Sequence, residues 1–303
     1  MPAPNSYGAF GEVPPGHDAA YPLSDAEYRR FQTFFQRATG IMFSDSKRYF
    51  VQKRVSARME ALGMSSANQY MDHCESQLNA GEFQHLVNAM TVNETYFNRE
   101  DFQFRTLVDE LLPQIASHKS YGQSIRIWSI PCSTGEEAYS LAIWLLEEWS
   151  DVDRYNVDIV ASDIDTGVLA SARRGLYSQR SIQGLKPQVL SKYFVKSPTG
   201  GWLIRDELRQ SITFTKVNIC DAVDTRDYTN FDIVFCRNML IYFDTESRAV
   251  ALKAIRRALT ADGYACFGHS DQIDRAEALF APVRFQNSVA YQATGAQVHD
   301  PVV

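Results

Sequence analysis

The stretch SIRIWSIPCSTGEEAYSLAIWLLEE, residues 124–148, decides the fold. Its first part alternates apolar and polar residues, which is typical of a β-strand, and residues 131–135 then form a tight turn. Over residues 138–146 the apolar side chains recur with helical spacing and share one broad face. The pattern predicts a strand, a turn and a helix, the opening unit of a doubly wound α/β fold. In such folds a ligand binds at the carboxyl end of the strand, over the start of the helix.

The turn limits the kinds of ligand. It contains one glycine, Gly135, whereas dinucleotide and triphosphate sites need a Gly-rich loop. Glu136 and Glu137 follow it in the first helical turn, where carboxylates satisfy the helix dipole and repel phosphate. A ligand with cationic groups and sugar hydroxyls, such as S-adenosylmethionine, suits these acids. They are equally consistent with ordinary stabilising first-turn residues, so the turn alone leaves both interpretations open.

The composition limits the class of protein. The chain has 303 residues, of which 45% are apolar and 22% charged, as expected for a globular protein of about two domains. Its net charge of −6 provides no overall basic field for nucleic acid. The longest apolar run, residues 138–146, is too short to span a membrane. Residues 1–20 lack the features of a signal peptide, and we expect a flexible leader there.

The cysteines indicate the compartment. There are five, an odd number without a Cys-x-x-Cys pair, which favours reduced thiols and a cytoplasmic protein. We expect Cys132, Cys220, Cys236 and Cys266, in or at the ends of predicted strands, to be small buried apolar residues. Metal ligation is not expected.

Residues 21–90 predict a small all-helical domain. Four helices are expected, over about residues 24–39, 46–62, 66–81 and 82–90, the first of them opened by a capping box at residues 24–27. On the second helix Lys47, Arg54 and Arg58 stand at i, i+7 and i+11 and form a narrow basic stripe beside the apolar side. From the pattern alone, such a stripe is usually a solvated face.

A polar segment with interleaved aromatics, TVNETYFNRE, occupies residues 91–100 and precedes a helix predicted over residues 102–116. Its two rings, Tyr96 and Phe97, can anchor the segment while the polar side chains face a site. A capped loop pinned by two rings is an equally good interpretation of the same residues.

The large domain continues the alternation of strand and helix. Strands are predicted over residues 124–130, 157–163, 212–219, 231–238 and 263–269, with an antiparallel strand at 288–293. Asp163 ends the second of these, where an acid accepts hydrogen bonds from a ribose diol. Asp165 is the predicted cap of the next helix, and a further helix is predicted over residues 245–259. Residues 176–211 are too long for a plain return and predict an inserted β-subdomain, with a helical turn near residue 190 and a hairpin around residues 198–201.

Five segments, in this order, resemble the bacterial chemoreceptor glutamate methyltransferase family, the CheR type. They are NETYFNR (93–99), WSIPCSTGEE (128–137), ASDIDT (161–166), FCRNMLIYFD (235–244) and GHSD (268–271). The chain departs from the family pattern at Asn98, where a second Phe is usual, and at Asp271, where Glu is usual. Neither departure is expected to touch the site residues, although Asn98 can alter packing beside Arg99.

The resemblance implies a Rossmann-like class I methyltransferase domain over residues 121–294, with the inserted β-subdomain. A helical receptor-docking domain over residues 21–90 precedes it. Residues 91–120 are then a linker and helix, and residues 295–303 a tail.

The resemblance also implies the site. Residues that it assigns to S-adenosylmethionine are Asn93, Thr95, Arg99, Glu137, Asp163, Asn218, Ile219, Arg237 and Asn238. Arg99 and Tyr242 lie closest to the transferred methyl. The implied substrate is a glutamate side chain on the cytoplasmic signalling helices of a chemoreceptor. The products are its methyl ester and S-adenosylhomocysteine, and no metal is involved.

This chemistry needs no general base. A solvent-exposed glutamate has a pKa of about 4.3 and is already a carboxylate at neutral pH. Transfer then depends on in-line placement, for which orientation supplies roughly 7 to 11 kcal/mol. His269 is therefore expected to be a structural residue at a strand end.

The same residues bear on three other possible functions. Amino-group and nucleic-acid methyltransferases carry an Asn/Asp-Pro-Pro-aromatic turn after the fourth strand, where this chain has Arg-Asn-Met-Leu-Ile-Tyr. An NAD-dependent dehydrogenase is disfavoured by the single glycine and the paired glutamates. A methyltransferase of another substrate, or a non-catalytic module that binds S-adenosylmethionine or a receptor, stays open as the alternative.

Docking follows from the implied substrate. The methylation region of a receptor in this family is an acidic helical surface, which gives the stripe of Lys47, Arg54 and Arg58 a partner. Some members also bind a receptor's C-terminal tail on a longer hairpin loop than residues 196–201. We therefore expect recognition mainly through the helical domain, without a tail peptide and without membrane insertion.

Overall fold

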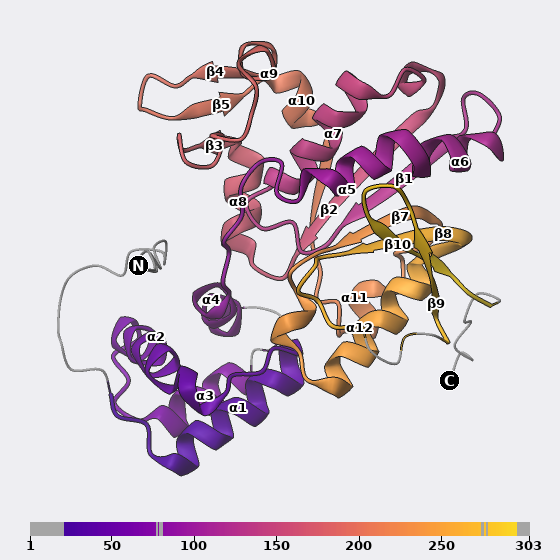
Figure 1. The fold of residues 1–303 in the computed structure, drawn as a ribbon. Coiled ribbons are helices and arrows are strands. Elements are labelled where there is room, and N and C mark those ends of the chain that lie inside the picture. The colour runs from indigo at the N-terminus through magenta and orange to yellow at the C-terminus, as the bar shows by residue number, and fades with distance from the viewer. Residues whose placement is uncertain (1–20, 77, 79–80, 274–275, 277, 296–303) are drawn as a thin grey trace, which may run out of the picture. The chain divides into compact units, whose positions relative to one another are not determined.

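The computed structural model describes residues 21–76, 78, 81–273, 276 and 278–295. The predicted leader, and the predicted tail beyond Gly295, lie outside these residues. The chain divides into two compact units (Figure 1). The helical unit comprises the described residues up to Phe34 together with those of Phe43–Glu94. The other unit comprises Phe35–Met42 and the described residues from Thr95 to Gly295, and it is named the catalytic unit here for the activity that the resemblance leads us to expect.

The helical unit confirms the four predicted helices. Its elements are α1 (Asp25–Thr39), the 3-10 turn η1 (Asp45–Lys47), α2 (Arg48–Ala61), α3 (Ala67–Glu75) and α4 (Gly81–Met90). The capping box is formed, because Ser24 N donates to Glu27 Oε2 at 2.9 Å and Glu27 N donates to Ser24 Oγ at 3.3 Å. The apolar side of α2 is buried at Val51, Val55 and Met59, whereas Leu62, which caps the helix, is 40% exposed.

A seven-stranded sheet organises the catalytic unit, in the order β6-β2-β1-β7-β8-β10-β9. The strands are β1 (Ser124–Ser129), β2 (Asn156–Asp163), β6 (Ile212–Lys216), β7 (Phe231–Cys236), β8 (Leu259–Phe267), β9 (Phe280–Arg284) and β10 (Val289–Ala293). The first five are parallel, and β10 runs antiparallel to both of its neighbours. This confirms the doubly wound fold and all six predicted strands. Strand β9 was missed.

Helices cover both faces of the sheet (Figure 1). The helical elements of this unit outside the insertion are α5 (Asp101–Thr106), the π-helical turn η2 (Leu107–Leu111), α6 (Leu112–Ser117), α7 (Glu136–Glu148), η3 (Val152–Arg154), α8 (Thr166–Arg174), α11 (Ala222–Thr225), η4 (Leu240–Tyr242) and α12 (Thr245–Ala258). Alternate residues of β1 face opposite cores. Ile127 belongs to one hydrophobic core together with Phe104 and Leu141. Trp128 belongs to the other core together with Leu252.

The inserted subdomain is a second, three-stranded sheet in the order β3-β5-β4. Its elements are β3 (Leu176–Tyr177), α9 (Pro187–Tyr193), β4 (Phe194–Lys196), β5 (Trp202–Ile204) and α10 (Asp206–Gln210). The predicted hairpin is confirmed by the antiparallel pairing of β4 with β5. Phe97 is buried edge-on between Tyr177, at 4.9 Å between ring centroids, and Phe194, at 5.3 Å. Tyr96 is 43% exposed, so one of the two rings anchors the segment.

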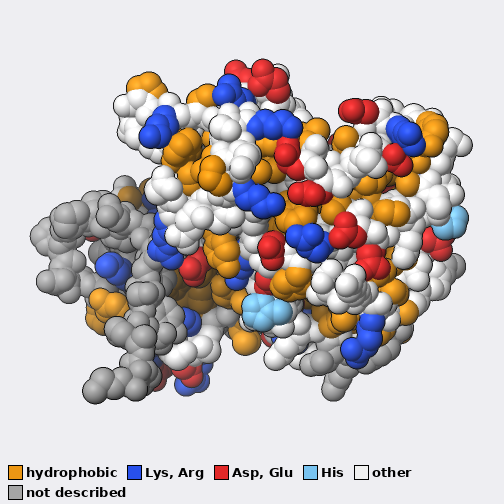
Figure 2. All heavy atoms as spheres, turned by 45° about the horizontal axis from the view of Figure 1, so that its top comes forward, with side chains coloured by type: hydrophobic (Ala, Val, Ile, Leu, Met, Phe, Trp, Pro, Cys, Tyr) orange, Lys and Arg blue, Asp and Glu red, His pale blue; other side chains and the backbone are white. Residues whose placement is uncertain are grey.

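The surface and the cysteines agree with a globular chain of mixed charge. On the face in Figure 2, acidic and basic side chains are interspersed. Cys132, Cys236 and Cys266 are buried as expected, and Cys220 is only half-buried. Within the part of the chain that the structure describes, no helix is long and apolar enough to cross a membrane.

The strand order reverses beside β1, which lies between β2 and β7. The connections from β1 and β7 therefore lead away in opposite directions. A crevice opens at such a point outside the carboxyl ends of the strands. The polar residues that follow β1, β2 and β7 meet there.

Candidate functional site

The turn after β1 is closely packed, which explains its single glycine. Gly135 has φ +95°, and a Cβ at this position would lie 2.9 Å from Ala172 Cβ and 3.1 Å from Tyr177 Oη. Glu136 then turns toward the inserted subdomain, where it accepts hydrogen bonds from Thr134 Oγ1 at 2.6 Å and Ser181 Oγ at 2.7 Å. Its burial raises its pKa. Glu136 is thus a structural tie, and of the two paired acids only Glu137 faces the strand ends.

Asp163, at the end of β2, is buried beside this turn. Its Oδ2 accepts a hydrogen bond from Ser133 N at 2.8 Å, and its Oδ1 accepts one from Asp165 N at 2.9 Å. Burial raises the pKa of Asp163 to about 7, although both backbone donors lower it. The backbone of Ile164 also donates to this carboxylate, which has about four lone-pair sites in all, so acceptor capacity remains for a ligand hydroxyl. Asp165 caps α8, as predicted, through hydrogen bonds from Gly167 N and Val168 N.

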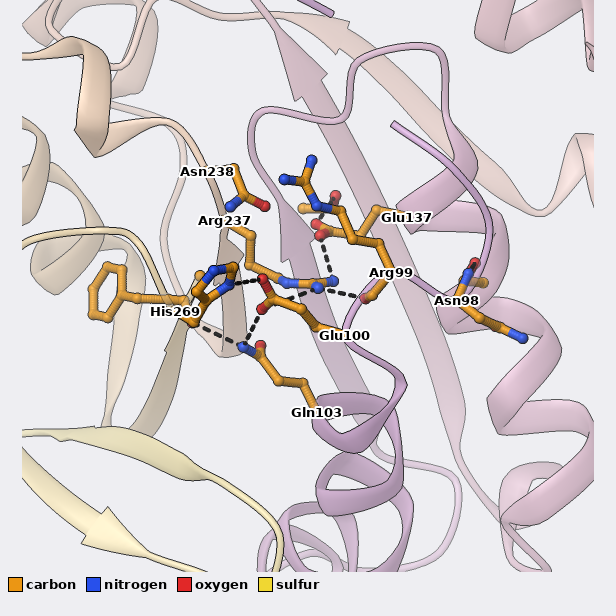
Figure 3. A network of polar contacts seen from close by, with 12 residues as sticks. Asn98, Arg99, Glu100, Gln103, Glu137, Arg237, Asn238 and His269 are labelled. Carbon is orange, nitrogen blue, oxygen red and sulfur yellow. Dashed lines mark hydrogen bonds and ion pairs between the residues drawn. The ribbon is translucent and has the colours of Figure 1, made fainter. Parts of the chain in front are cut away.

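Arg237, just beyond the end of β7, lies at the centre of an ion-pair network (Figure 3). Its NH1 lies 3.0 Å from Glu137 Oε2, its NH2 lies 3.3 Å from Glu100 Oε2, and NH2 also donates to the carbonyl of Arg99. Ser129 Oγ donates to Glu137 Oε1 at 2.7 Å. Burial raises the pKa of Glu137, against the lowering effect of Arg237. Nε of Arg237 is buried and has no hydrogen-bond partner among the described residues.

Sequence reasoning missed the far side of this network. Glu100 Oε1 lies 2.5 Å from His269 Nδ1, and Gln103 Nε2 donates to Glu100 Oε2 at 3.0 Å and to Phe267 O at 2.9 Å. Burial raises the pKa of Glu100, but the hydrogen bond from His269 and the charge of Arg237 outweigh it, so the pKa is lowered. His269 lies beyond the end of β8 and is exposed, with its imidazole paired to Glu100. The available signal was the position of Glu100, directly after Arg99 in the polar segment.

Asp271 corrects the prediction that neither departure from the family pattern touches the site. Its Oδ2 accepts hydrogen bonds from Asn238 N at 2.5 Å and from Gly268 N at 3.0 Å. A Cβ on Gly268 would lie 2.8 Å from Asp271 Oδ2 and 2.9 Å from Asn238 N, so the three groups are in close contact. Burial raises the pKa of Asp271. The shorter acid therefore holds the backbone of Asn238, which has φ +58°.

Asn218 and Ile219 follow β6, and both face the protein interior. Asn218 Nδ2 donates to Ala38 O at 2.8 Å, and its Oδ1 accepts a hydrogen bond from Cys220 N at 3.0 Å. Ile219 is buried. Both ends of the Asn218 amide are thus engaged by backbone groups of the catalytic unit.

The remaining predicted residues lie at three places. Tyr242, in η4, is 37% exposed, and its carbonyl accepts a hydrogen bond from Met42 N at 2.9 Å. The guanidinium of Arg99 lies 5.9 Å from the ring centre of Tyr96, and its charge lowers the pKa of Glu137. Thr95 is half-buried at the start of this part of the catalytic unit. Asn93 belongs to the helical unit, where its Nδ2 donates to Thr91 Oγ1 at 3.2 Å.

The three cations of the predicted basic stripe differ in their surroundings, and Lys47 lies in η1, just before α2. Arg58 forms a two-point ion pair with the buried Glu82, at 2.8 Å from Nε and 2.6 Å from NH2, and Tyr70 Oη donates to the same carboxylate. Arg54 Nε donates to Ala89 O at 2.7 Å, and burial lowers its pKa. Lys47 is exposed. Two of the three cations are therefore engaged within the helical unit.

The charges at the strand ends fit a cationic ligand. Glu137 and Glu100 form ion pairs with Arg237, the charge of Arg99 acts on Glu137, and Asp163 lies beside the turn that follows β1. Both Asp163 and Glu137 act on the buried Cys132 thiol, whose pKa is raised first by burial and further by these two charges. Carboxylates that can accept further hydrogen bonds suit a ribose diol and an ammonium group, and the buried Nε of Arg237 can donate to the carboxylate of an amino acid end. Among the described residues, no group of three or more His, Cys, Asp or Glu side chains is arranged to hold a metal ion.

Two family descriptions match the chain. "CheR methyltransferase, SAM binding domain" matches residues 93–289, and "CheR methyltransferase, all-alpha domain" matches residues 26–91. Chemotaxis protein methyltransferase 2 of Vibrio cholerae is 41% identical over 89% of this chain and 93% of its own length. The chemotaxis protein methyltransferase of Salmonella typhimurium is 37% identical over 82% of this chain and 84% of its own, and that of Escherichia coli 35% identical over 85% and 88%. The chain therefore belongs to the CheR family of S-adenosylmethionine-binding chemotaxis methyltransferases.

Proposed function

We propose that this protein transfers a methyl group from S-adenosylmethionine to glutamate side chains on the cytoplasmic signalling domain of a chemoreceptor. The products are a glutamate methyl ester and S-adenosylhomocysteine. Membership of the CheR family supports the reaction class. The observation that carries the site is the set of acids at the strand ends, where Glu137 and Glu100 pair with Arg237 and Asp163 ends β2 beside the turn after β1.

The cofactor, when bound, supplies an activated methyl group on a sulfonium. Asp163 is proposed to accept hydrogen bonds from the ribose diol, because it is the acid at the end of β2. Glu137, held by Ser129 and Arg237, is proposed to face the cationic amino acid end together with Arg99. Asn218, Ile219 and Asn238 are proposed to contribute backbone and apolar contacts. Asn93 and Thr95 complete the proposed set.

The protein's part in the transfer is placement. The substrate glutamate is ionised at neutral pH, so no residue has to remove its proton. Arg99 is proposed to orient the carboxylate or the amino acid end of the cofactor. Tyr242, with its partly exposed ring, is proposed to hold the attacking oxygen through its hydroxyl. Alignment of this kind lowers the barrier without a base or a metal.

Recognition is proposed to run mainly through the helical unit. The turn between β4 and β5 is closed by a hydrogen bond from Ser197 N to Gly201 O at 3.0 Å, and each of these strands has three residues. Strand addition by a peptide needs a free edge with room beside it. These short strands therefore favour docking that does not require a receptor tail. Micromolar binding of a receptor's C-terminal peptide in calorimetry would contradict this part of the proposal.

The test is methyl transfer itself. The protein is incubated with methyl-labelled S-adenosylmethionine and a panel of receptor signalling domains, each paired with a copy whose candidate glutamates are replaced by alanine. Label that is released by mild base, and is absent from the alanine copies, is expected. Base-stable label would indicate another substrate group. Binding of S-adenosylhomocysteine without transfer to any receptor would indicate a non-catalytic module.

A further inference from the structure

Arg99 lies between two residues in the left-handed backbone region. Asn98 has φ +60° and Glu100 has φ +54°. This region is unfavourable for residues with a Cβ, and only Asn and Asp tolerate it well. Two such residues on either side of one arginine form a strained turn that persists only where its surroundings hold it. Contacts on each side of Arg99 are therefore needed to hold this turn.

Asn98 is held by α7 (Glu136–Glu148). Its Oδ1 accepts a hydrogen bond from Trp144 Nε1 at 3.0 Å, and its backbone N donates to Ser140 Oγ at 3.1 Å. Figure 3 shows its side chain leaving the network on the opposite side from His269. The amino side of the turn is thus fixed to the helix that begins at the site.

Glu100 is held by contacts on the other side of Arg99. Its carboxylate, 9% exposed, contacts Arg237 at 3.3 Å, His269 at 2.5 Å and Gln103 at 3.0 Å. Arg237 also donates to the carbonyl of Arg99 itself. The carboxyl side of the turn is therefore fixed to the groups that follow β7 and β8. Because both neighbours of Arg99 are held by these contacts, the backbone of Arg99 is held as well.

We propose that Asn98 and Glu100 are positioning residues, which fix the strained turn and thereby aim Arg99 at the cofactor. This inference rests on the role of Arg99 in the proposed function. The side chain of Arg99 leaves the turn toward Glu137 (Figure 3), on whose pKa its charge acts. A change of φ on either side would swing the guanidinium away from that position. Asn98 acts only through Arg99, whereas Glu100 acts through Arg99 and Arg237.

The experiment is a double-mutant cycle on the full chain, with affinity for S-adenosylhomocysteine measured by calorimetry. Asn98→Ala is expected to weaken binding roughly threefold or more, the usual range for residues that act through a neighbour. In the Arg99→Ala background the same change is expected to have no further effect. Asn230→Ala is the matched control, because Asn230 also has a left-handed backbone (φ +58°) but directly precedes β7, at the opposite end of that strand from Arg237. It is expected to leave the affinity unchanged in both backgrounds.

Glu100 supplies the second arm. Glu100→Ala is expected to weaken binding in the wild-type background and to retain part of its effect in the Arg99→Ala background, because it also releases Arg237. Glu100→Gln, which keeps the shape and can still accept from Arg237, is expected to restore part of the affinity. Thermal melting of each variant confirms that the folded protein is being compared.

Three results would overturn the inference. The first is an equal loss for Asn98→Ala with and without Arg99, which would show a general effect on the fold. The second is unchanged affinity for both Asn98→Ala and Glu100→Ala. The third is unchanged affinity for Arg99→Ala alone, since the turn would then have no cofactor group to aim. Because binding is measured without a receptor, a wrong choice of substrate in the proposed function would leave these outcomes unaffected.

Discussion

Asp163 experiences two opposing effects. Three backbone amides favour its ionised form, but burial disfavours it more strongly and raises the pKa from 3.8 to about 7. Between these two pH values the folded state binds a proton that the unfolded state has lost. The stability contributed by this group is therefore present below about pH 4 and decreases as the pH rises toward 7. The site thus keeps an acid that is only half ionised at neutral pH.

This predicts a pH-dependent affinity for the cofactor product. A ribose diol donates to the ionised carboxylate, so binding of S-adenosylhomocysteine should strengthen from pH 6 to pH 8, by about tenfold at most for one group. Asp163→Asn should bind more weakly and lose this dependence. Calorimetry at the two pH values measures both effects. An equally steep dependence in Asp163→Asn would assign the titration to another residue.

Tyr242 allows the transfer step to be tested separately from binding. Tyr242→Phe removes only the hydroxyl from a side chain that is 37% exposed. If that hydroxyl holds the substrate carboxylate, turnover should decrease by about tenfold or more, the value of a lost hydrogen bond to a charged group. Affinity for S-adenosylhomocysteine should stay within twofold of the unmodified protein, roughly a measurement error. Unchanged turnover would remove Tyr242 from the mechanism.

At the scale of elements, the strand–turn–helix unit depends on Gly135. Gly135→Ala introduces a Cβ with φ +95° that lies 2.9 Å from Ala172 Cβ. Gly122→Ala is the matched control in the same unit, because Gly122 has φ +83° and no atom within 4 Å of the added Cβ. The control should cost about 1 to 2 kcal/mol of unfolding free energy from backbone strain. Gly135→Ala should cost about 1 to 3 kcal/mol more from overpacking.

Denaturant unfolding of both glycine variants distinguishes the two contributions. If the two substitutions cost the same, the turn has room for a side chain and the close approach of α8 is not required. Weaker binding of S-adenosylhomocysteine is expected for Gly135→Ala alone, because the turn also carries Ser133, whose backbone N holds Asp163.

The elements were largely predictable because periodicity is local. The alternation in β1, the capping box of α1 and the cap at Asp165 are short-range patterns, and each was recognised. Strand β9 was missed because its sequence, FAPVR, contains Pro282, which argues against a strand. It is tolerated there because β9 lies at the edge of the sheet.

The site was predictable only in part. Residues in the family motifs could be assigned by resemblance, but their partners could not. Arg58 and Glu82 are 24 residues apart in the sequence and join two helices. Glu100 contacts His269, which lies 169 residues further along the chain. Such contacts depend on how helices and strand ends pack, which helical or strand spacing does not encode. For the same reason, the sequence suggested three equivalent cations on one helix, whereas Lys47 lies in η1 and is the one of the three that is exposed.

At the scale of the whole molecule, the docking hypothesis can be tested with residues of different structural roles. Lys47→Glu changes an exposed charge, so the free energy of unfolding should change by less than about 0.5 kcal/mol. Receptor methylation should slow, and its slowing at high salt should become weaker, because salt screens contacts between exposed charges. Initial rates at two ionic strengths measure this. Equal rates for the variant and the unmodified protein would exclude Lys47 from docking.

Arg58 serves as the contrast. Arg58→Ala leaves the buried carboxylate of Glu82 without its cation, which should cost about 3 kcal/mol, the low end for a buried pair since Arg58 is 25% exposed. Chemical denaturation of the helical unit measures this cost. A slower methylation rate in this variant would therefore report on folding as well as docking. Stability unaffected by Arg58→Ala would return Arg58 to the docking surface.

The last residues of α1 belong to the catalytic unit, although the family's all-alpha domain includes them. Ala38 binds the side chain of Asn218, Gln36 Nε2 donates to Asp244 Oδ2 at 2.5 Å, and Met42 N donates to the carbonyl of Tyr242. The boundary between the two family domains therefore does not coincide with the boundary between the two compact units. A fragment that begins at Asn93 would lack the residues that support two proposed site segments. An exchange of helical domains between relatives would have to leave residues 35–42 with the recipient chain, so that the segments that carry Asn218 and Tyr242 keep their hydrogen-bond partners.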